Sequence, residues 1–234
     1  MHFINPFRGL RPNQKKASDV TIPSTDHLSE EMVLSHKKNN PWSYLNIFNP
    51  DGVASKSQKE IEIKAKEQFE LMKNKSILLK DGDKSFYIYR ISSKDHSQVG
   101  VIGTAKLSAY DNLHIRGHED IFFERSQKRF DQMNNLNAQI GPIYVVSPDD
   151  ENLNKLVDER VKLEPVHSFD SLDGYKHELW IINNQEDDML EMSVINPSFV
   201  MGPSLSDDID GTSTDIFVKL LTNQIPACPN VYFN

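Results

Sequence analysis

The sequence predicts a mixed α/β (α+β) fold, in which a mixed sheet is flanked by helices and followed by a short strand–helix tail. Three patterns predict this class. Residues 57–78 have the apolar spacing of an amphipathic helix, residues 86–91 (FYIYRI) form an aromatic and β-branched run of strand length, and both kinds of pattern alternate along the chain. With 234 residues, of which 38% are hydrophobic and 26% charged, the chain can bury the core of one or two domains.

The first half of the chain carries the clearest helix. Ser57 and Glu60 have the spacing of a capping box, which marks a helix start. The apolar positions that follow share one helical face: Ile61, Ala65, Phe69 and Met72. The dipeptide Asp81-Gly82 then predicts a turn into strand 86–91, and a polar loop separates this strand from a second one at 99–107.

The second half continues the alternation. The predicted elements are a helix at 119–135, a strand at 143–146 (IYVV), a helix over 153–161 and a strand at 177–182 (HELWII). Asp149 and Asp150 suit the start of the 153–161 helix, because carboxylates favour the positive end of the helix dipole. In the tail, MSVIN at 192–196 predicts a strand and residues 212–223 a helix.

Charge is distributed unevenly along the chain. Residues 186–234 hold eight carboxylates against one lysine, so this segment carries −7 of the formal net charge of −8. A net negative chain lacks the surplus of lysine and arginine that sequence-independent nucleic-acid binding requires, so we expect no nucleic-acid partner. The change of charge at residue 186 also suggests a boundary between two segments.

Three further features concern the compartment. The first residues lack the apolar run of a signal peptide, and no stretch approaches the roughly 20 apolar residues of a membrane span. Cys228 is the single cysteine, which excludes an internal disulfide framework and a cysteine-based zinc cluster. We therefore expect a cytoplasmic protein with no membrane partner.

Two motifs resemble cofactor or metal sites and are incomplete. Gly100 and Gly103 have the spacing of two glycines in a dinucleotide-binding loop, but Lys106 occupies the third glycine position and an ordinary strand is the simpler interpretation. His114 and His118 lie four residues apart, as zinc ligands on a helix do, yet no third ligand is evident. We expect no metal site.

The residues of the common catalytic motifs are missing as well. The chain has no Gly-x-Ser-x-Gly elbow and no phosphate-binding loop of the Gly-Lys-Ser/Thr kind, and Cys228 has no basic neighbour in sequence. We therefore assign no catalytic residue.

Six blocks of the sequence, in this order and spacing, resemble a known family. The blocks are INPFRGLRPNQKKASDV at 4–20, NPWSYLNIFNPD at 40–51, LLKDGDKSFYIYRI at 78–91, GVIGTAKLSAYDNLHIRGHE at 100–119, NLNAQIGPIYVVSPDDE at 135–151 and SLDGYKHELWII at 171–182. They are similar to the N-terminal part of the family called domain of unknown function 1015. The resemblance covers residues 3–185 and, by position in these blocks, implies four polar binding candidates: His118, Glu119, Asn137 and Gln139.

Two features of that family are absent here. Its Pro-Pro-Tyr-Asp segment is replaced by residues 22–26 (IPSTD), and its later Asp-Gly-His-His-Arg segment, which resembles one in ParB-like and sulfiredoxin-like nucleotide-using proteins, has no counterpart. Asp173-Gly174 with His177 belongs to an earlier block and does not replace it. The resemblance therefore leaves a nucleotide-dependent, kinase-like activity only as an alternative.

A second resemblance begins at residue 189. Residues 189–233 are similar to the later part of an extended short-chain dehydrogenase/reductase of the dihydroflavonol-reductase or epimerase type. By position, this resemblance implies a substrate wall that includes Asn196, Pro197, Gly202 and Pro203. That family uses a tyrosine with a lysine four residues later, and none of the seven tyrosines here has such a lysine. An NAD(P)-dependent oxidoreductase is therefore the other alternative.

Together these patterns predict a composite or truncated chain. An incomplete family domain would span 1–185, and a reductase-like fragment would span 186–234. The alternative is a single divergent domain. We expect a protein without an intact catalytic site and without a cofactor, which binds a small molecule or a protein partner; NAD(P) is expected only under the oxidoreductase alternative.

Overall fold

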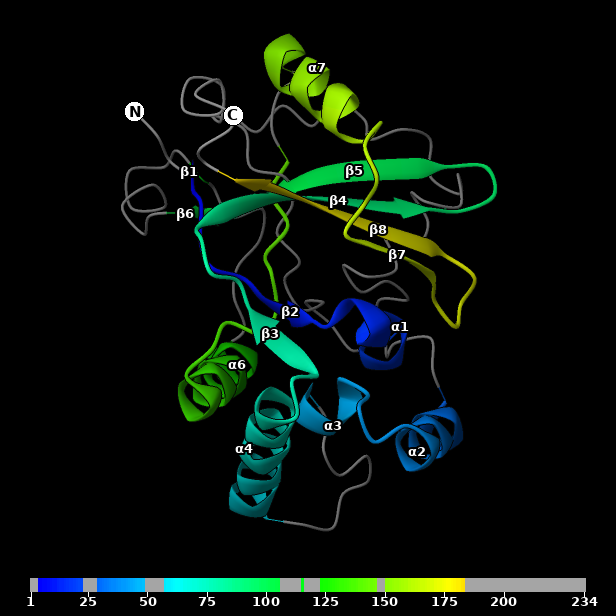
Figure 1. Cartoon of the computed structure of the whole chain (residues 1–234). Helices are drawn as coiled ribbons and strands as arrows, with labels where there is room; N and C mark the ends of the chain where they lie inside the picture. The colour runs from blue at the N-terminus through cyan, green and yellow to red at the C-terminus, as the bar shows by residue number, and fades with distance from the viewer. Residues whose placement is uncertain are drawn as a thin grey trace.

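The computed structural model describes residues 4–22, 29–48, 57–105, 115, 123–146 and 150–183, and Figure 1 shows their arrangement. Helices and strands alternate along these residues, which confirms the predicted mixed α/β class. None of the described helices has the length and apolar character needed to cross a membrane.

A four-stranded antiparallel sheet forms the centre of the fold. Its strands are β4 (Ser85–Ser92), β5 (Ser97–Ile102), β7 (His167–Asp170) and β8 (Lys176–Asn183), in the order β5-β4-β8-β7. A short connection joins β4 to β5 and another joins β7 to β8, and short connections force neighbouring strands to run antiparallel. All strand pairs among the described residues are antiparallel, although we predicted a mixed sheet.

Two short strand pairs attach the N-terminal residues to this sheet. Strand β1 (Ile4–Asn5) pairs with β6 (Thr104–Ala105), and β2 (Leu10–Pro12) pairs with β3 (Leu78–Lys80). Between them, Phe7 exchanges two backbone hydrogen bonds of 3.0 Å with Ser85 at the start of β4. Chain segments that are about 65 to 100 residues apart in sequence therefore lie side by side.

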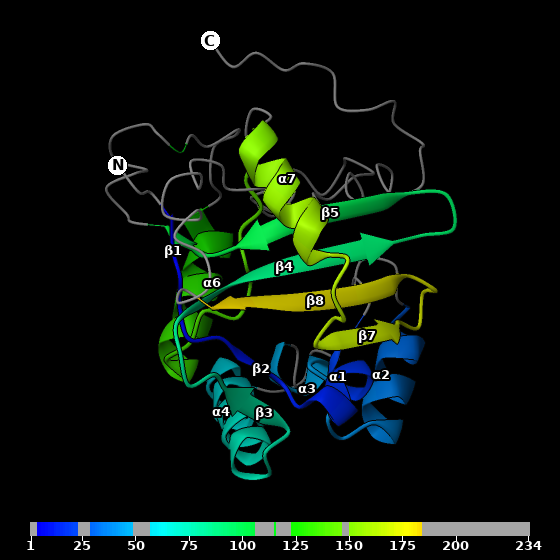
Figure 2. The same ribbon diagram turned by 45° about the horizontal axis from the view of Figure 1, so that its top comes forward.

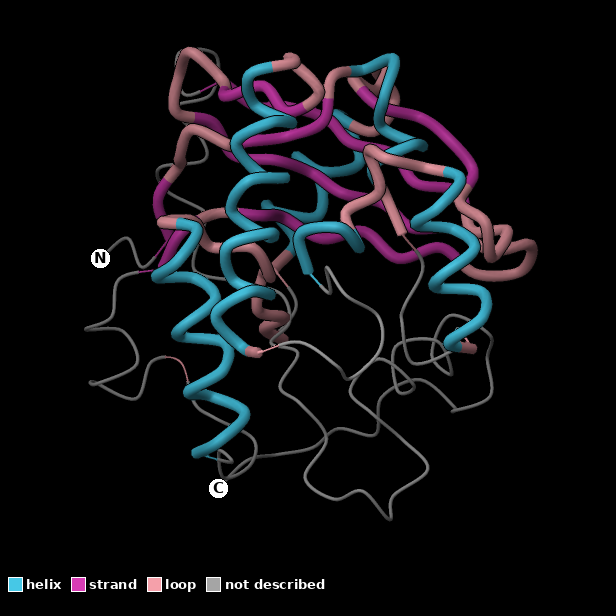
Figure 3. Tube along the Cα trace, turned by 90° about the horizontal axis from the view of Figure 1, so that it is seen from below, coloured by secondary structure: helices cyan, strands magenta, loops and turns pink. Residues whose placement is uncertain are grey.

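The helices lie on both sides of the sheet. A 3₁₀ turn (Gln14–Lys16) leads into α1 (Ala17–Val20), and the other helices are α2 (Glu30–Asn39), α3 (Leu45–Phe48), α4 (Gln58–Asn74), α6 (Phe123–Leu136) and α7 (Glu151–Arg160). Helix α7 lies above the sheet in Figure 1, and the remaining helices lie below it. Figure 2 shows α7 on the same side after a turn of the view, and Figure 3, seen from below, shows helices in front of the strands.

Two apolar clusters hold these layers together. The first joins the sheet to α7 and contains the buried residues Ile4, Phe86, Ile88, Leu156, Trp180 and Ile182. The second joins α1, α3, α4, β3 and α6 and contains Val20, Ile47, Ala65, Phe69, Met72, Ile77, Leu78 and Leu136. The face of α4 predicted from Ala65, Phe69 and Met72 is thus the face that packs.

Two of the predicted helix starts, those of α4 and α7, are confirmed in detail. Ser57 and Glu60 form both hydrogen bonds of a capping box at the start of α4. The side chain of Asp150 accepts hydrogen bonds from the amides of Asn152 and Leu153, at 2.9 and 3.0 Å, at the start of α7.

One predicted strand is wrong. Residues 143–146 form no strand, because none of the described strands pairs with their backbone. A side-chain hydrogen bond connects this segment to the sheet, because the amide of Gln98 on β5 donates to the hydroxyl of Tyr144. The predicted tail elements at 192–196 and 212–223, and the proposed boundary at 185/186, lie outside the described residues.

Candidate functional site

The two faces of the central sheet differ in chemistry. Side chains alternate along a strand, so the register assigns each residue to one face. The face that includes Phe86, Ile88, Trp180 and Ile182 belongs to the apolar cluster with α7. The other face, here called the polar face, carries a group of rings from three strands: Tyr87, Tyr89, His167, Phe169 and His177.

An ionic cluster crosses from the N-terminal strand to the polar face. Arg11 of β2 donates from Nε to both carboxylate oxygens of Asp81, at 3.0 and 3.1 Å, and from Nη2 at 2.9 Å. Tyr87 donates its hydroxyl proton to Asp81 Oδ2 at 2.8 Å. Arg11 Nη1 also reaches His167 Nε2 at 3.1 Å. We call Arg11, Asp81, Tyr87 and His167 the Arg11 cluster.

The local folds around Arg11 and Asp81 explain why they meet. Strands β2 and β3 pair with Leu10 opposite Lys80, so the residue after Lys80 lies beside the start of β2. The amide of Asp81 donates to the carbonyl of Gly9 at 2.9 Å, which fixes the turn that the dipeptide Asp81-Gly82 begins. The carboxylate therefore lies within reach of the guanidinium on the neighbouring strand.

Two pKa values in the Arg11 cluster follow from burial and charge. Burial and the hydrogen bond to Asp81 raise the pKa of Tyr87 to about 12. Burial and the nearby Arg11 guanidinium lower the pKa of His167, against the opposing effect of Asp81. Both side chains are therefore neutral near pH 7.

His167 has one unused hydrogen-bonding atom. Arginine can only donate, so Nε2 of His167 accepts and the proton of the neutral ring resides on Nδ1. Nδ1 is buried and has no hydrogen-bond partner among the described residues, and the residue as a whole is 4% exposed. Gln98 Oε1, also on the polar face, is buried without a partner in the same way.

A second polar chain runs along the same face into the β7–β8 turn. The hydroxyl of Tyr89 is 2.6 Å from His177 Nδ1, and His177 Nε2 is 2.8 Å from Ser171 Oγ. Ser171 Oγ in turn donates to the carboxylate of Asp173. Phe169 stacks on the imidazole with 5.3 Å between ring centroids. We call Tyr89, His177, Ser171 and Asp173 the His177 chain.

The direction of the hydrogen bonds in this chain follows from its acceptors. The Ser171 hydroxyl has one proton, and two acceptors lie beside it, the Asp173 carboxylate and the carbonyl of Tyr175. His177 Nε2 therefore donates to Ser171, and Nδ1 accepts from Tyr89. Burial lowers the pKa of His177 and raises the pKa of Tyr89, so both rings remain neutral near pH 7.

This direction is the reverse of that in a nucleophilic triad. In a triad the histidine accepts the serine proton, whereas here the histidine donates to the serine. Ser171 also belongs to the turn itself, because its amide donates to the Tyr175 carbonyl at 2.8 Å. The arrangement orders the hairpin and positions two aromatic hydrogen-bonding groups on the polar face.

The binding residues predicted from resemblance fall into two groups. His118, Glu119, Asn196, Pro197, Gly202 and Pro203 lie outside the described residues. Asn137 has a φ of 49° directly after α6, where asparagine tolerates the left-handed conformation that ends a helix. Gln139 donates to the carbonyl of Gly141 at 2.8 Å. Neither residue is hydrogen-bonded to the Arg11 cluster or the His177 chain.

Gly100 and Gly103, which have the spacing of two glycines in a dinucleotide-binding loop, belong to an ordinary strand and its end. Gly100 lies within β5, and Gly103 follows this strand rather than starting a helix. A Cβ atom on Gly103 would lie 2.3 Å from Cγ2 of Ile4, so close packing of β1 explains this glycine. Within the described ranges, no group of three histidine, cysteine or acidic residues is arranged to hold a metal ion.

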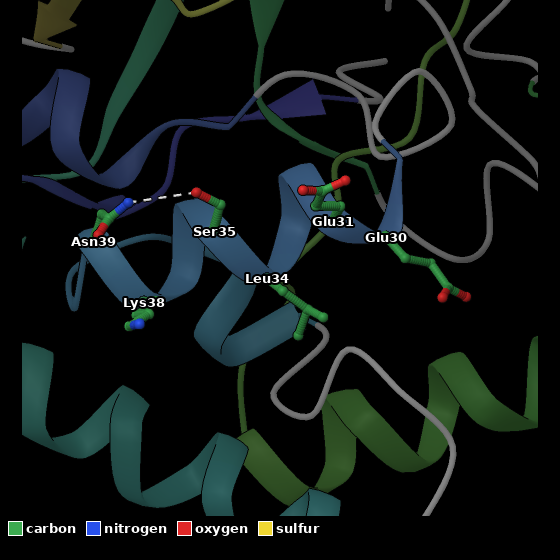
Figure 4. A pocket seen from close by; sticks show the side chains of 6 residues that line it. All are labelled: Glu30, Glu31, Leu34, Ser35, Lys38 and Asn39. Carbon is green, nitrogen blue, oxygen red and sulfur yellow. Dashed lines mark hydrogen bonds between the residues drawn. The ribbon is translucent and has the colours of Figure 1, made fainter.

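A surface hollow of about 580 Å³ lies along α2 (Figure 4). The described residues that line it all come from this one helix: Glu30, Glu31, Leu34, Ser35, Lys38 and Asn39. One internal hydrogen bond, from Asn39 to Ser35 at 3.4 Å, is drawn in Figure 4. Groups from a single helix face do not converge on a ligand, so the polar face is the stronger candidate.

The sequence analysis did not predict the polar face as a site, although the positions of several of its residues could have indicated it. Arg11, Asp81, Tyr87 and His177 all lie inside the blocks that resemble the known family. What the sequence did not show is that β2 and β7, which are separated by more than 150 residues, meet at one point.

Comparison with known proteins gives one match. A family model described as "Protein of unknown function (DUF1015)" matches residues 4–196. The match confirms the first resemblance, and it overlaps the first residues of the segment that resembles a reductase. No curated protein and no solved structure matches the chain.

Proposed function

Since the chain belongs to the DUF1015 family of proteins of unknown function, we propose that it is a binding protein without catalytic activity, whose ligand is a small, uncharged polar molecule. The proposed binding surface is the polar face of the central sheet. Tyr89, Leu179 and Ile181 are partly exposed there, which leaves part of this face open to a ligand.

The direction of the His177 chain is the observation that carries this proposal. It is the arrangement among the described residues that is most similar to a catalytic one, and its serine proton is held by Asp173 instead of His177. A nucleophilic serine needs a base that removes this proton, and the neutral His177 that donates to the serine cannot act as that base.

Charge decides the class of ligand. None of the residues that the register of β4, β5, β7 and β8 assigns to the polar face is a lysine or an arginine, and Arg11 of β2, which reaches this face, directs three of its contacts to Asp81. The nearby histidines are neutral. A phosphate would therefore find no lysine or arginine on these strands and an Arg11 already paired with Asp81, which favours an uncharged ligand over a nucleotide or NAD(P).

Hydrogen-bonding groups would orient such a ligand. Nδ1 of His167 is a donor, and Oε1 of Gln98 an acceptor, that have no partner among the described residues, and they lie on the two edge strands of this face, so each would bind a different group. A buried polar atom without a partner is destabilising, so a water molecule or a ligand group that pairs with it contributes to binding.

The composite origin of the chain also stays a proposal. Its support is the change of charge at residue 186 and the reductase-like sequence of residues 189–233. A peptide that crosses residues 183–195, detected by mass spectrometry of the protein made in its own cells, would show that the joined chain is produced. The single cysteine supports a reducing compartment, and we place the protein in the cytoplasm on that ground.

The test combines turnover with binding on the full chain. We expect no oxidation of NADPH with a panel of carbonyl compounds and no consumption of ATP with a panel of hydroxylated acceptors, compared with a heat-denatured sample. Ligand-detected NMR would then compare uncharged probes, adenosine and nicotinamide among them, with ATP and NADP⁺. We expect binding among the uncharged probes and weaker binding of the phosphorylated ones.

Two variants make the binding test specific. Tyr89→Phe removes a hydroxyl from the polar face, and Ser92→Ala removes one from the opposite face of the same strand. We expect Tyr89→Phe to weaken binding several-fold and Ser92→Ala to leave it unchanged. Turnover above background, or preferential binding of ATP or NADP⁺, would contradict the proposal.

A further inference from the structure

We propose that the hydrogen bond between Arg11 and His167 is an acid-sensitive latch, which joins strand β2 to the edge strand β7 at neutral pH and breaks when His167 gains a proton, so that the contact between these two strands loosens. This inference concerns regulation of the fold and does not depend on the ligand proposed above.

The latch joins strands β2 and β7 through one side chain from each. Strand β7 is an edge strand, paired with β8 on one side only. On its other side it contacts α1, and the Arg11 side chain reaches His167 across 156 positions of sequence. Among the described strands, β2 pairs with the three-residue strand β3 alone. Among the described residues, the bond between the Arg11 guanidinium and the His167 imidazole is the one hydrogen bond that joins β2 to β7.

Protonation of His167 reverses the role of the bonded atom. In the neutral ring, Nε2 accepts from Arg11 Nη1 at 3.1 Å. In the imidazolium both ring nitrogens carry protons, so two donors and two positive charges would face each other at that distance. With the residue 4% exposed, water cannot readily screen this repulsion. The hydrogen bond must therefore break.

The other charged groups around His167 do not reverse this outcome. Asp81 attracts the imidazolium, but its carboxylate already accepts from Arg11 and from Tyr87. Asp19, the charged residue of α1, pairs with Lys16 at 2.8 Å. Along β7 and β8, the charged residues Asp170, Lys176 and Glu178 lie on the opposite face of the sheet. Burial and Arg11 therefore dominate, and the pKa of His167 is lowered.

His177 provides an internal comparison on the same face. It is also buried and neutral, but its hydrogen-bond partners are the uncharged Tyr89 and Ser171, and its nearest charges are the carboxylates of Asp173 and Asp170. Protonation of His177 gains attraction from these carboxylates and meets no cation. It therefore lacks the repulsive contact that makes His167 a latch.

Hydrogen–deuterium exchange of the full chain tests the proposal. Between about pH 7.5 and about pH 5, corrected for the intrinsic exchange rate, we expect protection of the β2 and β7 amides to fall up to about tenfold while protection within α4 stays constant. In His167→Gln the amide oxygen accepts from Arg11 at both pH values, so this change should disappear. The matched variant His177→Gln should keep it.

A second measurement does not depend on any variant. The ¹⁵N shifts of the histidine rings report which nitrogen carries the proton, and we expect the Nδ1–H form for His167 at neutral pH. The Nε2–H form, equal protection of β2 at both pH values, or an unchanged pH response in His167→Gln would each overturn the proposal.

Discussion

The backbone amide of Gly9 donates a hydrogen bond of 2.7 Å to the hydroxyl of Tyr87, which in turn donates to Asp81. A Cβ atom on Gly9 would lie 2.6 Å from that same hydroxyl oxygen. The absence of a side chain at Gly9 therefore allows the chain before β2 to approach the sheet closely enough to complete the Arg11 cluster.

Substitution of Gly9 by alanine should destabilise the protein. The added methyl group would displace the Tyr87 ring or the strand, at a cost of about 1–3 kcal/mol in the free energy of unfolding. Urea denaturation followed by circular dichroism measures this change. Gly82→Ala is the matched control, because no atom lies within 4 Å of a Cβ atom there. Equal stability of the two variants would show that the close contact does not matter.

Alkaline pH should weaken the fold through Tyr87. Its pKa is raised to about 12 in the folded protein, against an ordinary value of 10.0. Between these two values the unfolded chain loses the proton that the folded chain retains, so stability is complete below pH 10 and falls as the pH rises toward 12. Tyr87→Phe should be less stable at pH 8 and show a shallower alkaline decline. An equally steep decline would exclude Tyr87 as its source.

Glu178 should stabilise the fold from the other face of the sheet, the one that packs against α7. It is 5% exposed, and its carboxylate lies 2.6 Å from Arg90 Nη2 and 3.0 Å from Lys176 Nζ. Burial alone would raise the pKa of Glu178, but these two cations hold it below its ordinary value. Stability from this group is thus present above the ordinary carboxyl range and is lost as the pH falls through the lowered pKa.

Glu178→Gln should therefore cost about 1–3 kcal/mol at pH 7, measured by urea denaturation. Glu70→Gln removes a carboxylate from the exposed pair with Lys73 and should cost less than about 0.5 kcal/mol. If both variants lost the same stability, burial of the Glu178 carboxylate would not be the reason.

The capping box of α4 offers a local test. Ser57→Ala removes the side-chain acceptor of the Glu60 amide, with an expected loss of about 1 kcal/mol. Ser57→Asp restores an acceptor and should recover most of the stability. Thermal unfolding followed at 222 nm compares the three proteins, and an unaltered midpoint in Ser57→Ala would contradict the role of the cap.

Elements with local determinants were predictable from the sequence. The α4 helix has its cap and its apolar face within residues 57–74, and β4 has an aromatic and β-branched sequence after a turn dipeptide. In both cases the residues that decide the structure are neighbours in the chain. Such patterns need no knowledge of the tertiary fold.

Elements that depend on a distant partner were not predictable. Strand β7 (HSFD) has one apolar residue and forms because β8 pairs with it, whereas IYVV at 143–146 has an ideal strand sequence and forms none. The ionic cluster is the extreme case, since Arg11, Asp81 and His167 meet only once three strand pairs are in place. A single sequence contains no direct signal of those pairings.

The position of β4 between β5 and β8 has a consequence for synthesis on the ribosome. Ile88 lies opposite Trp180, so one edge of this apolar strand has no partner until about 90 further residues have been made. At roughly 5–20 residues per second, that interval lasts on the order of 5 to 20 seconds. During this time the nascent chain presents an unprotected strand edge, which makes this stage of translation the one at which chaperone binding competes with aggregation.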